Sequence, residues 1–146
     1  APLEFSVTGE ASADVAEPES NVTLEMGEMY FTITDGAFVA GENIVHLYNA
    51  GVQPHFAEIM KVPDGTENAN IEALITLEMG GTPEAEPLSF EDVMPLAYLS
   101  EQSEGVSSWA PVSLEAGSYA LLCFVTDPET GMPHAMMGMH DVFVVE

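Results

Sequence analysis

Hydrophobic residues alternate with polar ones in several short stretches of the chain, as in strands that bury one face. In Asn43–Asn49, for example, Ile44, His46 and Tyr48 fall on one face. The run Tyr119–Val125 is instead apolar throughout and strongly favours a β-strand. The predicted strands are Leu3–Thr8, Val22–Met26, Met29–Thr34, Asn43–Asn49, His55–Val62, Val112–Leu114, Ser118–Val125 and Asp141–Val145. Short strands separated by turn signals predict an all-β sandwich.

The pattern changes to helical spacing after the turn residues Pro63–Gly65. Thr66 fits a helix N-cap, and apolar residues follow at helical spacing through Ile71–Glu78 until two glycines end the run. A second short helix is predicted around Phe90–Leu99, within a stretch rich in Pro, Ser and Glu. Residues 9–21 are small, acidic and interrupted by proline, and they predict a loop. We therefore expect one domain, residues 1–146, with a small helical and loop insert at about 66–110.

The charge balance is extreme, because Lys61 is the only Lys or Arg against 25 acidic residues and the formal net charge is −24. Such a surface repels nucleic acid and anionic lipid headgroups, so both are poor candidate partners. Few carboxylates can find a salt-bridge partner, and added salt relieves their mutual repulsion. The composition indicates a high-salt habitat, loosely bound cations, or a partner protein with a cationic docking face.

The chain carries the marks of an exported protein. It begins Ala1-Pro2-Leu3, without an initiator Met or a basic, apolar leader, as a mature chain does after its signal peptide is removed. No apolar run approaches the roughly 18–20 residues needed to span a bilayer, so we expect no membrane insertion by this chain. The predicted location is extracellular, periplasmic or at the cell surface.

Three segments carry residues suited to metal chemistry. A His follows a turn in Asn49–His55, a lone Cys ends an apolar strand, and soft ligands crowd the loop Met132–His140. A single Cys allows no intramolecular disulfide, so it is a reactive thiol, an intermolecular bridge or a metal ligand. Two imidazoles, one thiolate and a weak axial thioether define a blue-copper electron-transfer site. The candidate copper ligands are His55, Cys123, His134 and Met139.

Each of these residues also has a structural interpretation. His55 fits a buried His bonded to a backbone carbonyl, and Cys123 fits an inert core thiol. Met136 or Met137 can take the axial position in place of Met139. We expect Met132, Met136 and Met137 to form an apolar rim around an exposed edge of His134. The remaining two histidines, His46 and His140, are interpreted as structural.

The same segments resemble those of a known family. Tyr119–Cys123, the His134-x4-Met139 spacing and the final Val-Phe-Val-Val strand are similar to the C-terminal copper loop of plastocyanin-like cupredoxins. Asn49-Ala50-Gly51-x-x-Pro54-His55 is similar to the plastocyanin segment with the first His ligand, and the acidic halocyanins share the charge balance. The resemblance covers roughly Val22–Glu146, except residues 66–110. It implies a Greek-key β-sandwich of the cupredoxin type with a type 1 copper bound by the four candidate ligands.

One departure from plastocyanins concerns the copper loop, where residues 124–133 separate Cys123 from His134 and plastocyanins have only two intervening residues. Copper nitrite reductases have a similarly long gap in their type 1 site.

The function expected from these features is one-electron transfer by a copper carrier with a redox partner protein, and not catalysis. Two other functions remain open. The Met- and His-rich loop Met132–His140 suits delivery of Cu(I), and a cupredoxin-like domain without metal can serve as a surface or assembly module. A blue absorption band on addition of Cu(II) distinguishes the carrier from both.

Overall fold

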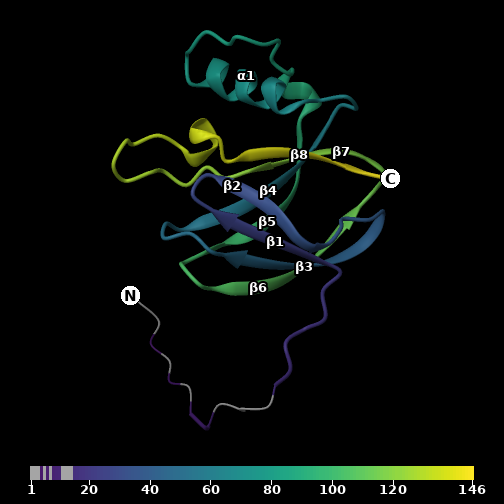
Figure 1. Cartoon of the computed structure of the whole chain (residues 1–146), viewed down its shortest axis with the longest axis vertical. Helices are drawn as coiled ribbons and strands as arrows, with labels where there is room; N and C mark the ends of the chain where they lie inside the picture. Colours follow the sequence, from purple (N-terminus) through teal and green to yellow (C-terminus); the bar gives the residue numbers. More distant parts are fainter. Residues whose placement is uncertain (1–3, 5, 7, 11–14) are drawn as a thin grey trace.

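The computed structural model describes residues 4, 6, 8–10 and 15–146, and its strands form two four-stranded sheets (Figure 1). The strand predicted at Leu3–Thr8 falls largely outside the described residues. The strands are β1 (Val22–Gly27), β2 (Tyr30–Gly36), β3 (Gly41–Asn49), β4 (His55–Val62), β5 (Met94–Gln102), β6 (Ser107–Leu114), β7 (Gly117–Leu122) and β8 (His140–Val145). The helical elements are α1 (Asn68–Glu78) and the 3₁₀ turns η1 (Phe90–Asp92) and η2 (His134–Met137). No helix in these ranges is long and apolar enough to cross a membrane.

The two sheets have the strand orders β2-β1-β3-β6 and β5-β4-β7-β8. β1 runs parallel to β3, with Val22 opposite Val45, and the other paired strands are antiparallel. The chain passes between the sheets from β3 to β4, from β5 to β6 and from β6 to β7. The prediction of an all-β, Greek-key sandwich of the cupredoxin type is confirmed.

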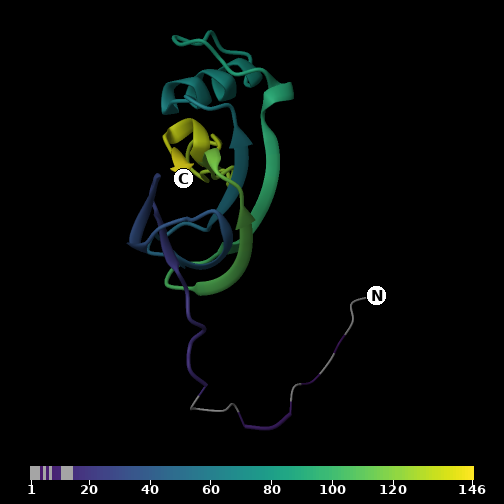
Figure 2. The ribbon, with the colours of Figure 1, turned by 90° about the vertical axis from the view of Figure 1, so that its right-hand side faces the viewer.

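The main core lies between the sheets, and strand β7 shows how the sequence specifies it. Tyr119 and Leu121 pack into this core, whereas Ala120 and Leu122 pack against α1 on the outer face of the second sheet. Because successive side chains of a strand point to opposite faces, a strand covered on both sides must be apolar at every position. Both views place α1 at one end of the molecule, beside β8 and η2 (Figures 1 and 2). The uninterrupted apolar run is therefore explained by a helix that covers the sheet.

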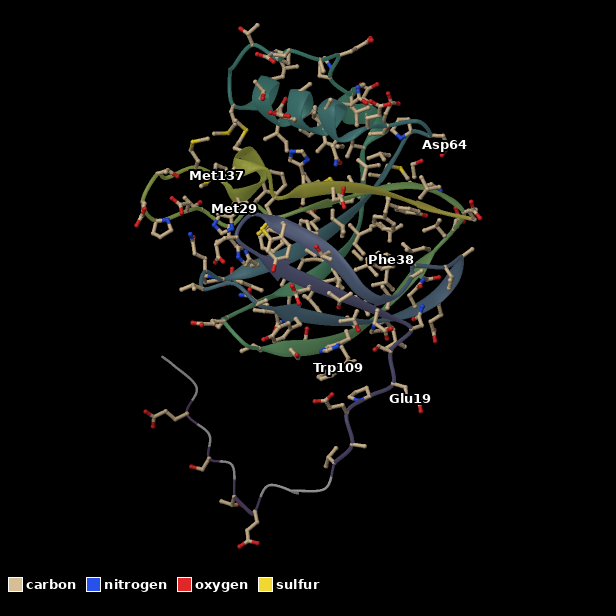
Figure 3. The ribbon with its side chains drawn as sticks, in the orientation of Figure 1. Glu19, Met29, Phe38, Asp64, Trp109 and Met137 are labelled. Carbon is tan, nitrogen blue, oxygen red and sulfur yellow. The ribbon has the colours of Figure 1, made fainter. Side chains whose placement is uncertain are left out.

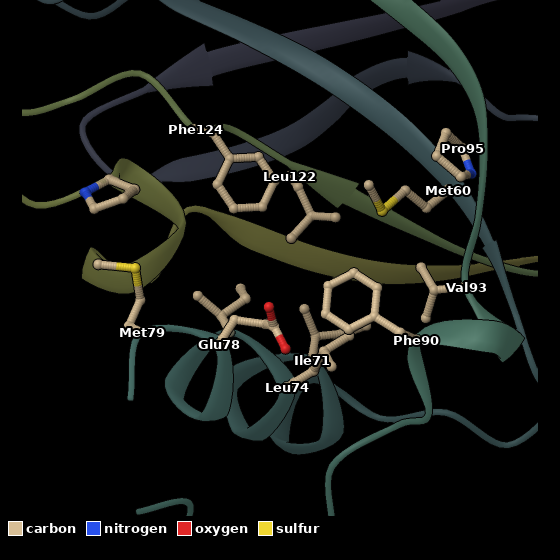
Figure 4. A pocket seen from close by; sticks show the side chains of 12 residues that line it. Met60, Ile71, Leu74, Glu78, Met79, Phe90, Val93, Pro95, Leu122 and Phe124 are labelled. Carbon is tan, nitrogen blue, oxygen red and sulfur yellow. The ribbon is translucent and has the colours of Figure 1, made fainter. Parts of the chain in front are cut away.

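Helix α1 does not close completely onto the sheet. An apolar cavity of about 370 Å³ remains between α1, η1 and strands β4, β5 and β7 (Figure 4). Glu78 is the one charged residue that lines it. Leu122 and Phe124 line the same cavity and flank Cys123 in the sequence.

The helix predicted around Phe90–Leu99 is wrong. Only η1 is helical there, and the rest is β5, an edge strand in which Leu99 is buried and most other side chains are exposed. Pairing with β4 overrides the weak local pattern of such an edge strand. Part of the predicted 66–110 insert, residues 94–102 and 107–110, thus lies in the sheets, and the assignment of 1–146 to one domain stays a prediction.

The start of α1 also differs in detail. Its N-cap is Glu67 and not Thr66, and the Glu67 N–H donates to Asn70 Oδ1 at 2.8 Å. The Thr66 hydroxyl instead donates to the carbonyl of Pro63 at 2.7 Å, which closes the preceding turn.

Candidate metal centre

The four candidate ligands lie at one end of the sandwich, the end where Met29 and Met137 are labelled in Figure 3. His55 is the first residue of β4, Cys123 directly follows β7, His134 begins η2, and Met139 precedes β8. All four are fully buried, with 0% relative exposure. Strand ends and short turns of a rigid sandwich therefore deliver all four residues to one region.

Asn49 builds the turn that presents His55. The Asn49 side chain is buried; its Oδ1 accepts the N–H of Gly51 at 2.8 Å, and its Nδ2 donates to the carbonyls of Gln53 (2.8 Å) and Gln102 (2.9 Å). An Asn side chain that bonds to the backbone two residues later is the usual way to close such a turn. The Asn-Ala-Gly segment thus fixes where β4 begins and where His55 lies.

The long loop between Cys123 and His134 returns to the sheet by backbone hydrogen bonds. The N–H of His134 donates to Val125 O at 2.8 Å, and the N–H of Ala135 donates to Cys123 O at 2.7 Å. On the other side, the N–H of Cys123 donates to Met139 O at 3.2 Å. The added residues form a bulge that Asp127 closes, since its Oδ1 accepts from the backbone N–H of Thr130 at 2.7 Å. The loop length therefore does not displace the second His from the Cys.

The donor atoms of three ligands converge. His55 Nδ1 and His134 Nδ1 are 3.0 Å apart, and Cys123 Sγ is 3.9 Å from the former and 3.7 Å from the latter. A first-row metal ion about 2.0–2.3 Å from each donor of a triangle holds the donors about 3.5–4 Å apart. Both sulfur–nitrogen separations fall in this range, and the 3.0 Å between the two nitrogens is shorter. The backbone of Met139 is bonded to both Cys123 and His134, with its N–H donating to His134 O at 3.0 Å.

Burial sets the protonation of these groups. Desolvation lowers the pKa of His55 and of His134 below the usual value and raises the pKa of the Cys123 thiol. The imidazoles are thus neutral, as metal ligands must be, whereas the thiol needs a nearby cation to ionise. His55 Nε2 is buried and makes no hydrogen bond to any described residue, although Glu28 Oε1 lies 3.5 Å away. A metal bound at Nδ1 would leave the ring proton on Nε2, the nitrogen that faces the Glu28 carboxylate, so the donor set and this unpaired atom both fit a bound metal.

The expected exposed edge of His134 is not observed. His134 has 0% exposure, and its Nε2 lies 3.0 Å from Gln53 Oε1. The long loop folds Asp127 over the same edge, and Gln53 Nε2 donates to Asp127 Oδ2 at 2.8 Å. Of the three Met residues expected to form a rim, Met132 and Met137 are partly exposed, at 39% and 36%, whereas Met136 packs against the apolar cluster under α1.

Three residues beside the ligands escaped the sequence analysis: Glu28, Gln53 and Asp127. Hydrogen bonds from the Gln53 side chain and from Thr130 lower the pKa of Asp127 to about 2. Burial raises the pKa of Glu28, but backbone hydrogen bonds, first that from Gln53, outweigh it and the net pKa is lowered. Gln53 had one available signal, its position two residues before His55. No sequence signal distinguishes Glu28 and Asp127 from the other members of the 25 acidic residues.

The two other histidines lie outside the donor triangle. His46 stacks on Trp109, with ring centroids 4.5 Å apart, and its Nε2 lies 3.0 Å from Ser107 Oγ. His140 is half-buried in β8, and its pKa is lowered by burial. Neither residue belongs to the group formed by His55, Cys123 and His134.

No protein-family model and no curated protein sequence matches the chain at a significant level. Several solved structures are similar to the chain. The reduced auracyanin of Roseiflexus castenholzii is 22% identical over 85% of this chain and 94% of its own, with a TM-score of 0.51. Auracyanin A of Chloroflexus aurantiacus, a "blue" copper protein, is 20% identical over 86% and 98%, with a TM-score of 0.48. Amicyanin of Paracoccus versutus is 22% identical over 92% and 87%, with a TM-score of 0.43. The first of these likenesses and the strand order agree: the chain has the cupredoxin fold, and its His–Cys–His cluster fits a type 1 copper site.

Proposed function

We propose that the protein binds one copper ion through His55, Cys123, His134 and Met139 and acts as a one-electron carrier, not as an enzyme. The observation that carries the proposal is the buried triangle of two imidazole Nδ1 atoms and one sulfur, with separations of 3.0, 3.7 and 3.9 Å. Two nitrogens and one thiolate sulfur in this arrangement suit copper in both of its oxidation states. Copper bound there supplies reversible exchange of one electron.

The protein's contribution is a rigid and dry site. Each of the four ligands is fully buried, so water is excluded from the donor triangle. The backbone of Met139 is hydrogen-bonded to Cys123 and to His134 at 3.2 and 3.0 Å, and Asn49 fixes the turn before His55. Ligands held in this way move little when the charge of the site changes, which keeps electron exchange fast. The Cys123 thiol gives up its proton when copper binds, because the cation stabilises the thiolate.

The exposed side chains near the metal centre indicate where a redox partner would dock. Among the residues close in sequence to the ligands, Val52 is 74% exposed, and Phe124, Met132 and Met137 are each 36–39% exposed. We propose that a redox partner docks against these apolar side chains while its cationic surroundings meet the acidic remainder of the chain. Export of the chain to an extracellular, periplasmic or cell-surface location is part of the same proposal.

The test is a titration of the purified protein with Cu(II), followed by visible absorption, electron paramagnetic resonance and metal analysis. We expect a strong blue band at one copper per chain. Cys123→Ser should abolish the band, whereas the control His46→Gln, which lies outside the triangle, should retain it. A band that persists in Cys123→Ser, or no copper uptake by the wild type, contradicts the proposal. Tight Cu(I) binding without a blue band would favour copper delivery.

A further inference from the structure

A chain of hydrogen bonds leads from a carboxylate to the outer edge of His134. Asp127 Oδ2 accepts from Gln53 Nε2 at 2.8 Å, and Gln53 Oε1 lies 3.0 Å from His134 Nε2. Asp127 is itself fixed, because its Oδ1 accepts from Thr130 Oγ1 and from the backbone N–H groups of Glu129 and Thr130 at 2.7–3.1 Å. Asp127 is 4% exposed and His134 is 0% exposed, and the Gln53 side chain between them is partly buried.

The donor and acceptor groups along this chain of hydrogen bonds can be assigned in only one way. The pKa of Asp127 lies at about 2, so its carboxylate is ionised at neutral pH and can only accept hydrogen bonds. The Gln53 group that faces it must therefore be the NH₂, and the group that faces His134 must be the carbonyl oxygen. A carbonyl oxygen also only accepts, so His134 Nε2 must carry a proton. In a neutral imidazole the other nitrogen, Nδ1, then holds its lone pair free.

The free lone pair points where a metal would bind. His134 Nδ1 is the atom 3.7 Å from Cys123 Sγ and 3.0 Å from His55 Nδ1. In the metal-free protein, His55 Nδ1 is then the protonated nitrogen and donates the hydrogen bond to His134 Nδ1. That assignment leaves the buried His55 Nε2, which makes no hydrogen bond to the described residues, without a proton.

We infer that Gln53, oriented by Asp127, is a positioning residue of the metal centre that fixes the His134 proton on Nε2 and so presents Nδ1 to the metal. The same residue also supports the second imidazole, because its backbone N–H donates to Glu28 Oε1 at 2.7 Å. The inference rests on the proposed function for its metal, but its tautomer can be measured without any metal. Partners that fix the orientation of a ligand His are worth about 10–100-fold in metal affinity.

The first experiment uses the metal-free, ¹⁵N-labelled chain. Long-range ¹H–¹⁵N correlation spectra at neutral pH distinguish a protonated Nε2 from a protonated Nδ1. We expect His134 to carry its proton on Nε2 in the wild type and to lose this preference in Gln53→Leu. A wild-type spectrum with the His134 proton on Nδ1 overturns the inference, whether or not the protein binds copper.

The second experiment measures Cu(I) affinity by competition with a chromophoric chelator, together with the reduction potential. Gln53→Leu should weaken Cu(I) binding about 10–100-fold and shift the potential. The matched control is Asn43→Leu, which removes a buried amide side chain near the start of β3, bonded to Val39 and Gly41, and should leave both values unchanged. Equal losses in the two variants would indicate a merely structural role and refute the inference.

A double variant that exchanges the amide of residue 53 and the carboxylate of residue 127 restores the chain of hydrogen bonds. In Gln53→Glu with Asp127→Asn, a carboxylate faces His134 Nε2 and the new amide N–H donates back to it, while Oδ1 of residue 127 keeps its backbone partners. We expect the double variant to recover the Nε2 tautomer and most of the Cu(I) affinity lost in Asp127→Asn alone. Failure of this rescue in a folded double variant contradicts the inference, even if Gln53→Leu does not fold.

Discussion

Gly51→Ala is expected to disturb the metal centre through Glu28, a residue that the substitution does not replace. A Cβ at position 51 would lie 2.7 Å from both carboxylate oxygens of Glu28, closer than such atoms approach in proteins. The Glu28 side chain must therefore move away. It then loses the hydrogen bond from the Gln53 N–H (2.7 Å) and its place 3.5 Å from His55 Nε2.

The magnitude follows from these contacts. A hydrogen bond to a charged group contributes about 1.5–3 kcal/mol to stability. Since the Glu28 side chain is 39% exposed, solvent screening reduces this to about 1 kcal/mol. We expect Gly51→Ala to lower the free energy of unfolding of the metal-free protein by about 1 kcal/mol, and to weaken copper binding by about tenfold because His55 loses its outer acceptor.

The assay is a double-mutant cycle measured by urea unfolding in 1 M NaCl, with Glu28→Ala as the second substitution. If the new methyl group acts only by displacing Glu28, the double variant should be no less stable than Glu28→Ala alone. The coupling should then be about 1 kcal/mol, well above the scatter expected of independent sites. Additive losses, or a Gly51→Ala protein with wild-type stability and copper affinity, would refute the reasoning.

Four further predictions concern the fold and the site. Tyr119→Phe should lower the free energy of unfolding by about 1 kcal/mol, because the Tyr119 hydroxyl accepts from the Glu115 N–H at 3.1 Å and donates to the Glu115 carbonyl at 2.9 Å. The control Tyr98→Phe, at a 59% exposed site, should change the thermal unfolding temperature little. Asp127 has a folded pKa of about 2, below the ordinary 3.8, so it stabilises the fold above pH 4 and this contribution disappears as the pH falls toward 2. Asp127→Asn should therefore make the urea unfolding midpoint depend less on pH between pH 4 and pH 2. An unchanged pH dependence of the midpoint would contradict this. Met139→Leu conserves volume and should cost the metal-free protein less than about 1.5 kcal/mol while shifting the reduction potential; an unshifted potential would argue against axial ligation. Raising NaCl from low concentration to 1 M should increase the unfolding temperature, because the net charge is −24, and a decrease would show that self-repulsion is not limiting.

The sequence alone was sufficient for the features that depend on local periodicity and on residue type. Alternation and apolar runs predicted the central strands β3, β4 and β7, because burial of one or both faces leaves a direct record in the sequence. The ligand types and their order along the chain predicted the group that the fold brings together, His55, Cys123 and His134.

Only the tertiary structure decided the features that depend on pairing between distant segments. Edge strand β5 has little alternation to read, and it forms because β4 offers hydrogen-bonding partners. Glu28 and Asp127 are two of 25 acidic residues, and nothing local distinguishes them; the fold selects them by placing one beside His55 and the other, through Gln53, behind His134. His134 was expected to have an exposed edge, but Gln53, held by Asp127, covers it, since a side chain's exposure depends on what the fold packs against it.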